Sequence, residues 1–221
     1  MKGSEILQYV DHTLLKPTAR WQDIRVLCEE AIEYHTASVC VPPCYVKRIH
    51  DTYGDRINIC TVVGFPLGYA STKSKKAECE QAIEDGAGEI DMVINITDVK
   101  NGDFKKVEEE IAVLKRTVGD RILKVIIETC YLTKEEKLAM CRAVTDAGAD
   151  FIKTSTGFGT GGAVIEDIRL FKEHIGPDVK IKAAGGIREL SDLEAFIGEG
   201  CRRIGTSSAV SLIKGMAAKD Y

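Results

Sequence analysis

Two lysines lie inside short segments whose other residues are typical of buried strands. Lys153 stands in FIKT (residues 151–154), directly before a glycine-rich loop, and Lys182 stands in VKIKAAGG (179–186). A lysine is costly inside a packed strand unless it is paired or used. If these strands are neighbours, the two ammonium groups repel each other. One of them should then lose its proton easily and could attack a carbonyl to form a Schiff base.

The size of this effect is large enough to matter for chemistry. A free lysine, with a pKa of about 10.4, is neutral about once in 2,500 molecules at pH 7. Lowering the pKa to about 7.5 would give roughly 600 times more neutral amine. That shift costs about 4 kcal/mol, which a nearby cation and partial desolvation can supply.

A carboxylate is expected beside the two lysines. Three helix-to-strand junctions, EDGAGEID, TDAGADFIK and GEGCRRIG, align at a glycine, and EYHTASVC aligns with them at a histidine. Because strand side chains alternate between faces, residues equally distant from these junctions should point to the same side. Five positions after the aligned residue stand Cys40, Asp91, Lys153 and Gly205. Asp91 is therefore predicted to lie near Lys153, where it could transfer protons directly or through a water.

Simpler interpretations of these three charges stay open. Lys153 and Lys182 could each extend to solvent from a strand end. Lys180 has the same parity as Lys182, which favours this interpretation for the second lysine. Asp91 could be a structural acceptor for loop amides.

Further polar residues follow or begin other expected strands. Lys124 and Glu128 could belong to the same polar interior, or could pair only with each other. Asp11, near the end of the first strand, is a similar candidate. His12 beside it is expected to be a packed, hydrogen-bonded residue and not a catalyst.

Strand and helix patterns alternate along the whole chain. TKEEKLAMCRAVTDAG is one of the helical segments, and Thr133 and Glu136 form a capping box at its start. Strands that alternate with helices pair in parallel, so eight units predict an α/β fold, a single (β/α)8 TIM barrel over residues 1–221 with a short N-terminal helical extension. A doubly wound open sheet is the alternative, which the missing G-x-G-x-x-G turn weakens. The expected strands cover residues 9–13, 37–41, 57–65, 89–95, 122–129, 150–155, 179–186 and 202–207.

Glycine-bearing segments follow the last two expected strands. In barrels of this kind, the loops after strands 7 and 8 often bind a substrate phosphate. Gly185 and Gly186 would let backbone amides approach an anion, while Ser207 and Ser208 could cap a helix and present its amides. Ordinary helix caps and turns are the alternative interpretation. The glycines between 157 and 162 add a third flexible edge but lack the G-K-[ST] of a P-loop.

Composition argues against several classes of protein. Hydrophobic residues make up 44% and charged residues 29% of the chain, as in a globular enzyme, and the net charge of −4 argues against a nucleic-acid partner. No stretch approaches the roughly 18 apolar residues of a membrane span, and the first residues lack the apolar core of a signal peptide. The eight cysteines contain no CxxC pair and the four histidines no HExxH spacing. Reduced thiols and no metal are therefore expected.

Five strings carry a resemblance to a known family. DHTLLKP, EIDMVIN, FIKTSTGF, KAAGGIR and RIGTSSA closely resemble the 2-deoxyribose-5-phosphate aldolases, and the likeness runs from about residue 9 to residue 210. It implies a class I aldolase on a TIM barrel, without metal or cofactor. Such an enzyme reversibly cleaves 2-deoxy-D-ribose 5-phosphate to acetaldehyde and D-glyceraldehyde 3-phosphate in deoxynucleoside breakdown. The resemblance further implies a cytoplasmic location and no membrane partner, and it leaves open a homo-oligomer, dimer or tetramer.

The resemblance also implies roles for residues in these strings. Lys153 looks like the Schiff-base lysine, Lys182 like the second lysine that perturbs it, and Asp91 like the proton donor and acceptor. The substrate- and phosphate-binding candidates are Thr156, Gly157, Gly185, Gly186, Gly205, Ser207 and Ser208. The accessory candidates are Asp11, Cys40, Arg188 and Tyr221.

The chain departs from the family pattern at one position. Some members carry a phosphate-binding lysine after the TSTG glycine, where this chain has Phe158. Phosphate would then be bound by amides, hydroxyls and Arg188. Tyr221 either reaches the active site, as in some relatives, or is a terminal residue without function. Two other functions stay open: another Schiff-base aldolase or transaldolase on the same fold, and a non-catalytic phosphosugar-binding barrel.

Overall fold

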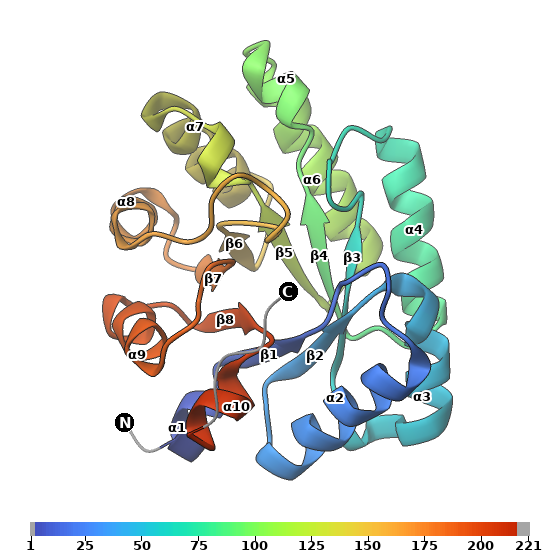
Figure 1. Cartoon of the computed structure of the whole chain (residues 1–221). Coiled ribbons are helices and arrows are strands. Elements are labelled where there is room, and N and C mark those ends of the chain that lie inside the picture. Colours follow the sequence, from blue (N-terminus) through green and yellow to red (C-terminus); the bar gives the residue numbers. More distant parts are fainter. Residues whose placement is uncertain (1–2, 216–221) are drawn as a thin grey trace.

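Eight parallel strands close into a barrel in the computed structural model, which describes residues 3–215 (Figure 1). Each strand pairs with its neighbours in the sequence, and the first strand closes the ring against the eighth. The prediction of a (β/α)8 barrel is thereby confirmed, and the open-sheet alternative is wrong. The strands are β1 Val10–Thr13, β2 Ser38–Val41, β3 Ile59–Val63, β4 Glu89–Val93, β5 Ile122–Ile126, β6 Phe151–Lys153, β7 Lys180–Ala184 and β8 Arg203–Thr206.

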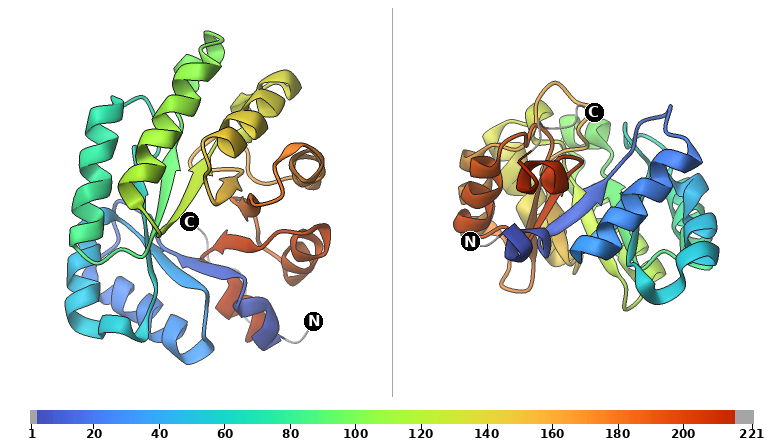
Figure 2. Two further views of the ribbon diagram at one scale, coloured as in Figure 1. Left: turned by 180° about the vertical axis from the view of Figure 1, so that it is seen from behind. Right: turned by 60° about the horizontal axis from the view of Figure 1, so that its bottom comes forward.

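Helices lie outside the ring and cover it, as the two views in Figure 2 show. In the sixth α-helix, Val107, Ile111, Leu114 and Val118 are buried at helical spacing, so one stripe of the helix packs inward. Within residues 3–215, no helix combines the length and the apolar character needed to cross a bilayer. The helices are α1 Gly3–Leu7, α2 Trp21–Tyr34, η1 Pro43–Tyr45, α3 Val46–Tyr53, η2 Gly54–Arg56, α4 Thr72–Glu84, α5 Ile96–Lys100, α6 Phe104–Val118, η3 Thr129–Tyr131, α7 Lys134–Asp146, α8 Ile165–His174, α9 Leu190–Glu199 and α10 Ala209–Ile213.

The turn residues at the helix-to-strand junctions set the phase of the strands that follow. Gly86, Gly148 and Gly200 have φ angles of 106°, 72° and 112°, which a glycine adopts without steric cost. His35, at the aligned position of an earlier junction, also lies in the left-handed region, with a φ of 52°. Because these junctions share one kind of turn, residues at equal distances after them face the same side of the barrel.

Apolar side chains form two separate clusters. The larger cluster fills the space between the barrel and the helices. The smaller one consists of Leu15, Cys40, Cys60 and Val62, with Phe65 packed against it. The Cys60 thiol donates a hydrogen bond to a charged side chain of β4 at 3.2 Å, so this cluster borders the polar interior of the ring.

The predicted capping box at the start of α7 offers a test of local stability. Thr133 Oγ1 accepts the N–H of Glu136 at 3.3 Å, and the Glu136 carboxylate accepts the N–H of Thr133 at 2.7 Å. Thr133→Ala removes the first bond, so the free energy of unfolding should fall by about 1 kcal/mol and Tm by about 2–4 °C in thermal melts. Lys134→Ala changes an exposed neighbour and keeps both bonds. A similar loss of Tm in both variants would contradict the assigned cap.

Candidate active site

A network of ion pairs fills part of the barrel interior. Asp91 of β4 lies at its centre: Lys153 Nζ and Lys182 Nζ both donate to Oδ2, at 2.7 and 2.6 Å, and Lys124 Nζ donates to Oδ1 at 2.8 Å. Lys182 also donates to Asp11. The predicted proximity of Asp91, Lys153 and Lys182 is confirmed.

Two further charged residues extend the network. Arg203 of β8 bonds the carboxylate of Asp11 and donates to that of Glu89 at 2.8 Å. Glu89 also pairs with Lys124 at 2.6 Å. Within residues 3–215, this network joins four basic side chains to three carboxylates, namely Lys124, Lys153, Lys182 and Arg203 with Asp11, Glu89 and Asp91.

The register of neighbouring strands explains why these side chains meet. Lys153 is the Cα partner of Lys182, and Lys182 is also the partner of Arg203. On the other side, Asp91 is the partner of Lys124. In a barrel, residues two apart along a strand face the same side, so Glu89 and Asp91 both point inward. Glu89 and Arg203 were missed by sequence reasoning, although each stands two positions before a residue of the aligned set.

Neighbouring opposite charges hold Asp91, Lys124 and Lys182 in the ionised state. Burial pushes the pKa of Asp91 up, but the ammonium groups of Lys124, Lys153 and Lys182 outweigh it and hold that pKa well below its ordinary value. Burial pushes the pKa of Lys182 down, but the carboxylates of Asp11 and Asp91 raise it above its ordinary value. The pKa of Lys124 is raised in the same way, against its burial, chiefly by Asp11 and Asp91.

The simpler interpretations of the lysines are not supported. Lys153 is 3% exposed and Lys182 is fully buried, so neither extends to solvent, whereas Lys180 at the start of β7 is exposed. Lys124 belongs to the network, and the Glu128 carboxylate bonds Thr156. The interpretation in which Lys124 and Glu128 pair only with each other is therefore wrong.

A cavity of about 230 Å³ opens at the carboxyl ends of β7 and β8. Gly185 and Gly186 line it with φ angles of 82° and 75°, a left-handed backbone that glycine adopts without steric cost. Gly205 connects the cavity to the charged network, because a Cβ at this position would lie 3.2 Å from Cε of Lys182. The predicted binding residues that line the cavity are Gly157, Gly185, Gly186, Gly205 and Ser208, together with the accessory residue Arg188.

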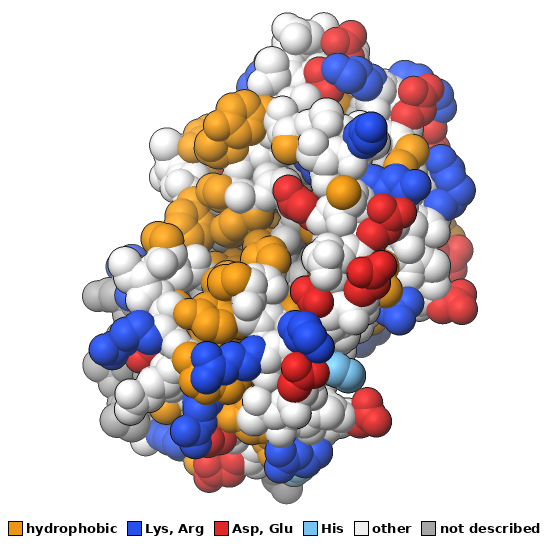
Figure 3. Space-filling view, turned by 90° about the vertical axis from the view of Figure 1, so that its right-hand side faces the viewer, with side chains coloured by type: hydrophobic (Ala, Val, Ile, Leu, Met, Phe, Trp, Pro, Cys, Tyr) orange, Lys and Arg blue, Asp and Glu red, His pale blue; other side chains and the backbone are white. Residues whose placement is uncertain are grey.

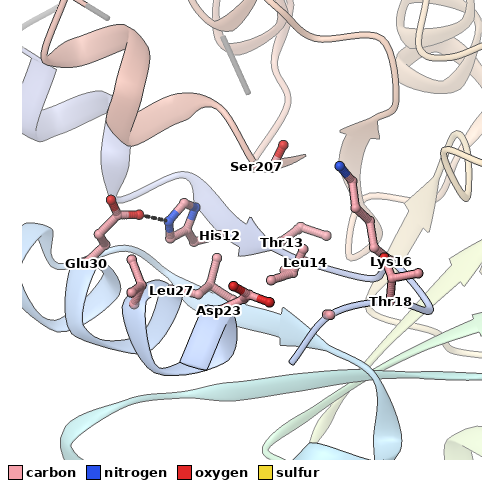
Figure 4. A pocket seen from close by; sticks show the side chains of 11 residues that line it. His12, Thr13, Leu14, Lys16, Thr18, Asp23, Leu27, Glu30 and Ser207 are labelled. Carbon is pink, nitrogen blue, oxygen red and sulfur yellow. Dashed lines mark hydrogen bonds and ion pairs between the residues drawn. The ribbon is translucent and has the colours of Figure 1, made fainter. Parts of the chain in front are cut away.

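Two of the predicted binding residues point elsewhere. Ser207 lines a different cavity, of about 380 Å³, between β1 and α2 (Figure 4). In that cavity the imidazole of His12 turns to Glu30, at 2.8 Å, as expected of a packed, hydrogen-bonded histidine. Thr156 is buried and donates its hydroxyl to Glu128, so this hydroxyl is already committed.

The remaining accessory candidates lie around the network or outside it. Cys40 is buried beside Cys60, and a hydrogen bond between the two thiols lowers the pKa of Cys40. The side chain of Arg188 is exposed, and its backbone N–H donates to Asp192 at 3.0 Å. Tyr221 lies outside the described residues.

The network also brings together atoms that could ligate a metal ion. The ligand atoms of Cys40, Cys60 and Asp91 lie within 4.8 Å of one another. No spacing in the sequence signals this group, because it forms across strands. The same Asp91 carboxylate already binds three ammonium groups, so a metal ion would enter a strongly cationic neighbourhood.

The mouth of the barrel has an apolar rim. A groove of about 610 Å³ is lined by Leu15, Val62, Phe65 and Leu67, among others. Phe158, which is 47% exposed, packs edge-to-face against Phe65 with ring centroids 5.3 Å apart. On the face shown in Figure 3, apolar side chains gather in a hollowed band. The departure at Phe158 thus adds to an apolar surface where a lysine would add charge.

Comparison with known proteins identifies close relatives. Residues 5–215 match the model of a family described as DeoC/LacD family aldolase. A deoxyribose-phosphate aldolase of Clostridium botulinum (strain Alaska E43 / Type E3) is 68% identical over 221 residues, which cover 100% of both chains, and one of Clostridioides difficile (strain 630) is 56% identical over 98% of this chain and 99% of the relative. The solved tetrameric deoxyribose phosphate aldolase of Aeropyrum pernix superposes with a TM-score of 0.87 at 30% identity, over 97% of this chain and 92% of that chain.

The charge balance of the network can be tested by removing its central carboxylate. Asp91→Asn removes the carboxylate that pairs with the ammonium groups of Lys124, Lys153 and Lys182. The substitution should lower the free energy of unfolding by about 3–5 kcal/mol near neutral pH. In this variant the pKa of the uncompensated ammonium groups is lower in the folded than in the unfolded chain. The penalty is therefore largest well below a free lysine's pKa of about 10.4 and shrinks as the pH rises towards it.

Urea unfolding at about pH 7 and about pH 9.5 measures both effects. Glu29→Gln is a suitable control, because it breaks an exposed ion pair with Arg25 and should cost less than about 1 kcal/mol at either pH. If Asp91→Asn costs no more than this control, the network does not stabilise the fold as described.

Proposed function

The chain belongs to the DeoC/LacD family of aldolases, and we infer that it reversibly cleaves 2-deoxy-D-ribose 5-phosphate to acetaldehyde and D-glyceraldehyde 3-phosphate. It is a lyase that forms a lysine Schiff base and serves the degradation of deoxyribose phosphates. Besides the likeness to relatives named deoxyribose-phosphate aldolase, one observation of the site supports this function. A single buried carboxylate oxygen, Oδ2 of Asp91, accepts hydrogen bonds from two lysines.

Lys153 is the proposed nucleophile. The pKa values of Lys124 and Lys182 are raised, so these two side chains keep their protons. Within the described part of the chain, residues 3–215, Lys153 forms an ion pair with Asp91 alone, and its side chain is 3% exposed whereas those of Lys124 and Lys182 are fully buried. The charge count supports the same choice, because four cations face three carboxylates and the loss of one proton balances the network.

The reaction then follows from an uncharged amine on Lys153. Its Nζ adds to the C1 aldehyde of the open-chain sugar, and loss of water gives an iminium. The C2–C3 bond breaks and its electron pair passes to the iminium, while the C3 hydroxyl gives up its proton and becomes the aldehyde of glyceraldehyde 3-phosphate. The resulting enamine takes a proton at C2, and water hydrolyses the new iminium to release acetaldehyde and restore Lys153.

Asp91 and Lys182 are the proposed proton-transfer groups, acting with a water. In the free site the Asp91 carboxylate faces three ammonium groups, so it is a weak base. When the iminium becomes a neutral enamine, Asp91 loses one of these three cations. Its proton affinity therefore rises at the step in which the C3 hydroxyl releases its proton. Lys182 stays charged throughout and keeps Asp91 oriented.

The cavity at the ends of β7 and β8 is the proposed site of the 5-phosphate. Its glycines, Gly157, Gly185, Gly186 and Gly205, leave backbone groups open to an anion. Arg188, at its exposed edge, adds a positive charge. Gly205 lines the cavity and also packs close to the side chain of Lys182, so the cavity lies beside the charged network.

The assembly and cellular setting remain proposals. The Aeropyrum pernix relative is described as tetrameric, and we propose that this chain also forms a homo-oligomer, which light scattering would test. The steps above use no cofactor. The cytoplasmic location implied by the resemblance stays a prediction.

Borohydride trapping tests the assignment of the nucleophile. Reduction of the enzyme in the presence of acetaldehyde should fix a two-carbon adduct on Lys153, which peptide mass spectrometry locates. Lys153→Met should form no adduct and lose all measurable turnover. Lys182→Met keeps the nucleophile but should turn over about 100-fold more slowly or worse.

The same assay separates the proposal from other functions. An adduct on Lys124 or Lys182 of the wild-type enzyme would contradict the assignment to Lys153. Turnover with dihydroxyacetone in place of acetaldehyde as the aldol donor would indicate a different Schiff-base aldolase. Binding of the phosphosugar without glyceraldehyde 3-phosphate release would indicate a non-catalytic barrel.

A further inference from the structure

Glu128 is buried in a strained conformation just after β5. Its side chain is 1% exposed, and its backbone has a φ of 52° and a ψ of 67°. Within residues 3–215, Glu128 and His35 are the two non-glycine residues with a positive φ. Such a conformation costs about 1–3 kcal/mol and persists where the surroundings enforce it, often at functional sites.

In the β6–α8 loop, the Glu128 carboxylate accepts hydrogen bonds from one residue, Thr156. Its two oxygens accept the N–H of Thr156 at 3.2 and 3.3 Å, and Oε2 also accepts the Thr156 hydroxyl. Thr156 Oγ1 in turn accepts the N–H of Phe158 at 3.0 Å. This chain of bonds fixes the backbone on both sides of Gly157.

The Glu128 carboxylate bonds Thr156 although the ammonium group of Lys153 is near enough to act on it electrostatically. Burial raises the pKa of Glu128, and Lys153 is among the groups that oppose this rise. Within residues 3–215, Glu128 nevertheless forms no ion pair, and both its oxygens bond Thr156. The carboxylate therefore acts on the loop and not as a partner of the lysines.

The loop passes directly over Glu128 and then reaches the anion cavity. A Cβ on Gly159 would lie 2.9 Å from Sγ of Cys130 and 3.1 Å from the carboxylate carbon of Glu128, so a side chain there would have to displace these two side chains. Gly157, with a φ of 86°, lines the cavity, and a Cβ on Gly185 would lie 3.5 Å from its Cα. The Glu128–Thr156 bonds thus set one wall of the cavity.

The loop also carries a polar group that no described residue satisfies. The hydroxyl of Ser155 is fully buried and has no hydrogen-bond partner within residues 3–215. Ser155 lies close to Gly185, because a Cβ added to Gly185 would be 3.5 Å from the Cβ of Ser155. Buried hydroxyl groups are normally paired, and this unpaired one lies in the loop next to the residue that Glu128 binds.

We propose that Glu128 is a positioning residue for phosphate recognition: it holds the 154–159 loop in the conformation that forms one wall of the anion cavity. This rests on the proposed function, in which the cavity binds the 5-phosphate. Most residues that line the cavity are glycine or carry uncharged side chains, so recognition depends on the direction of backbone groups. That direction changes when the loop is released, whereas the ion pairs of Asp91 and Lys153 do not involve Glu128.

Kinetics with two substrates test the proposal. Glu128→Gln keeps the size of the side chain but weakens the bonds to Thr156, and Thr156→Val removes the hydroxyl without changing any charge near Lys153. In both variants kcat/KM for 2-deoxyribose 5-phosphate should fall at least about tenfold further than kcat/KM for 2-deoxyribose, mainly through KM, because a hydrogen bond to a charged group is lost. Thr156→Ser keeps the hydroxyl and should restore the selectivity for the phosphate.

Inhibition by inorganic phosphate gives a readout that does not involve the lysine chemistry. With 2-deoxyribose as substrate, the inhibition constant of phosphate should rise about tenfold or more in Glu128→Gln and Thr156→Val. Glu128→Asp keeps the charge but is one methylene shorter, so it should behave in the same way and replaces Glu128→Gln if that variant does not fold.

The possible results separate two kinds of failure. Equal losses on both substrates, or an unchanged inhibition constant for phosphate, would overturn the positioning role. If the wild-type enzyme cleaves neither substrate, the proposed function itself fails. Thermal melts of every variant show whether a loss of activity reflects unfolding.

Discussion

One constraint governs the interior of this barrel: the Asp91 carboxylate must balance three ammonium groups away from bulk water. A buried ion is tolerated only when it is paired and hydrogen-bonded, because desolvation of an isolated charge costs several kcal/mol. Asp91 meets this condition with both oxygens, and Asp11 and Glu89 complete the compensation of Lys124, Lys182 and Arg203. The network still carries one more cation than it has carboxylates. Among residues 3–215, Lys153 pairs with Asp91 alone, and this is why we propose it as the Schiff-base nucleophile.

The fold makes this arrangement by repeating one local turn. Gly86, Gly148 and Gly200, together with His35 in the junction between α2 and β2, adopt left-handed backbones before strands that begin in the same phase. The parallel ladder then places inward residues of neighbouring strands side by side. Where the ring must admit Lys182, β8 supplies Gly205, because a side chain there would meet the lysine stem. The catalytic residues therefore lie on rigid strands, while the loops after them form the cavity for an anion.

Much of this site could be predicted from the sequence because strand periodicity and junction spacing are local signals. The alignment of junctions placed Cys40, Asp91, Lys153 and Gly205 on one side, and the structure brings Asp91 and Lys153 into contact. The same parity rule would have found Glu89, which stands two positions before Asp91. Arg203 bears the same relation to Gly205.

Other features depend on packing that no spacing encodes. Lys75 of α4 is fully buried, but it lies outside the ring, where Glu110 and the Val93 carbonyl satisfy it, so burial alone does not mark a catalytic lysine. Ser207 and Ser208 are adjacent in the sequence yet line different cavities, and both follow the end of β8 at Thr206, where strand alternation no longer predicts which way a side chain points.

The protonation states of the three lysines test this charge balance most directly. Nitrogen-15 NMR of the lysine side chains of the free enzyme, assigned with Lys153→Met, Lys182→Met and a Lys124→Met variant, distinguishes an amine from an ammonium group. The balance predicts charged Lys124 and Lys182 near neutral pH and a measurable fraction of uncharged amine at Lys153. Three ammonium signals, with no neutral fraction at Lys153, would contradict it.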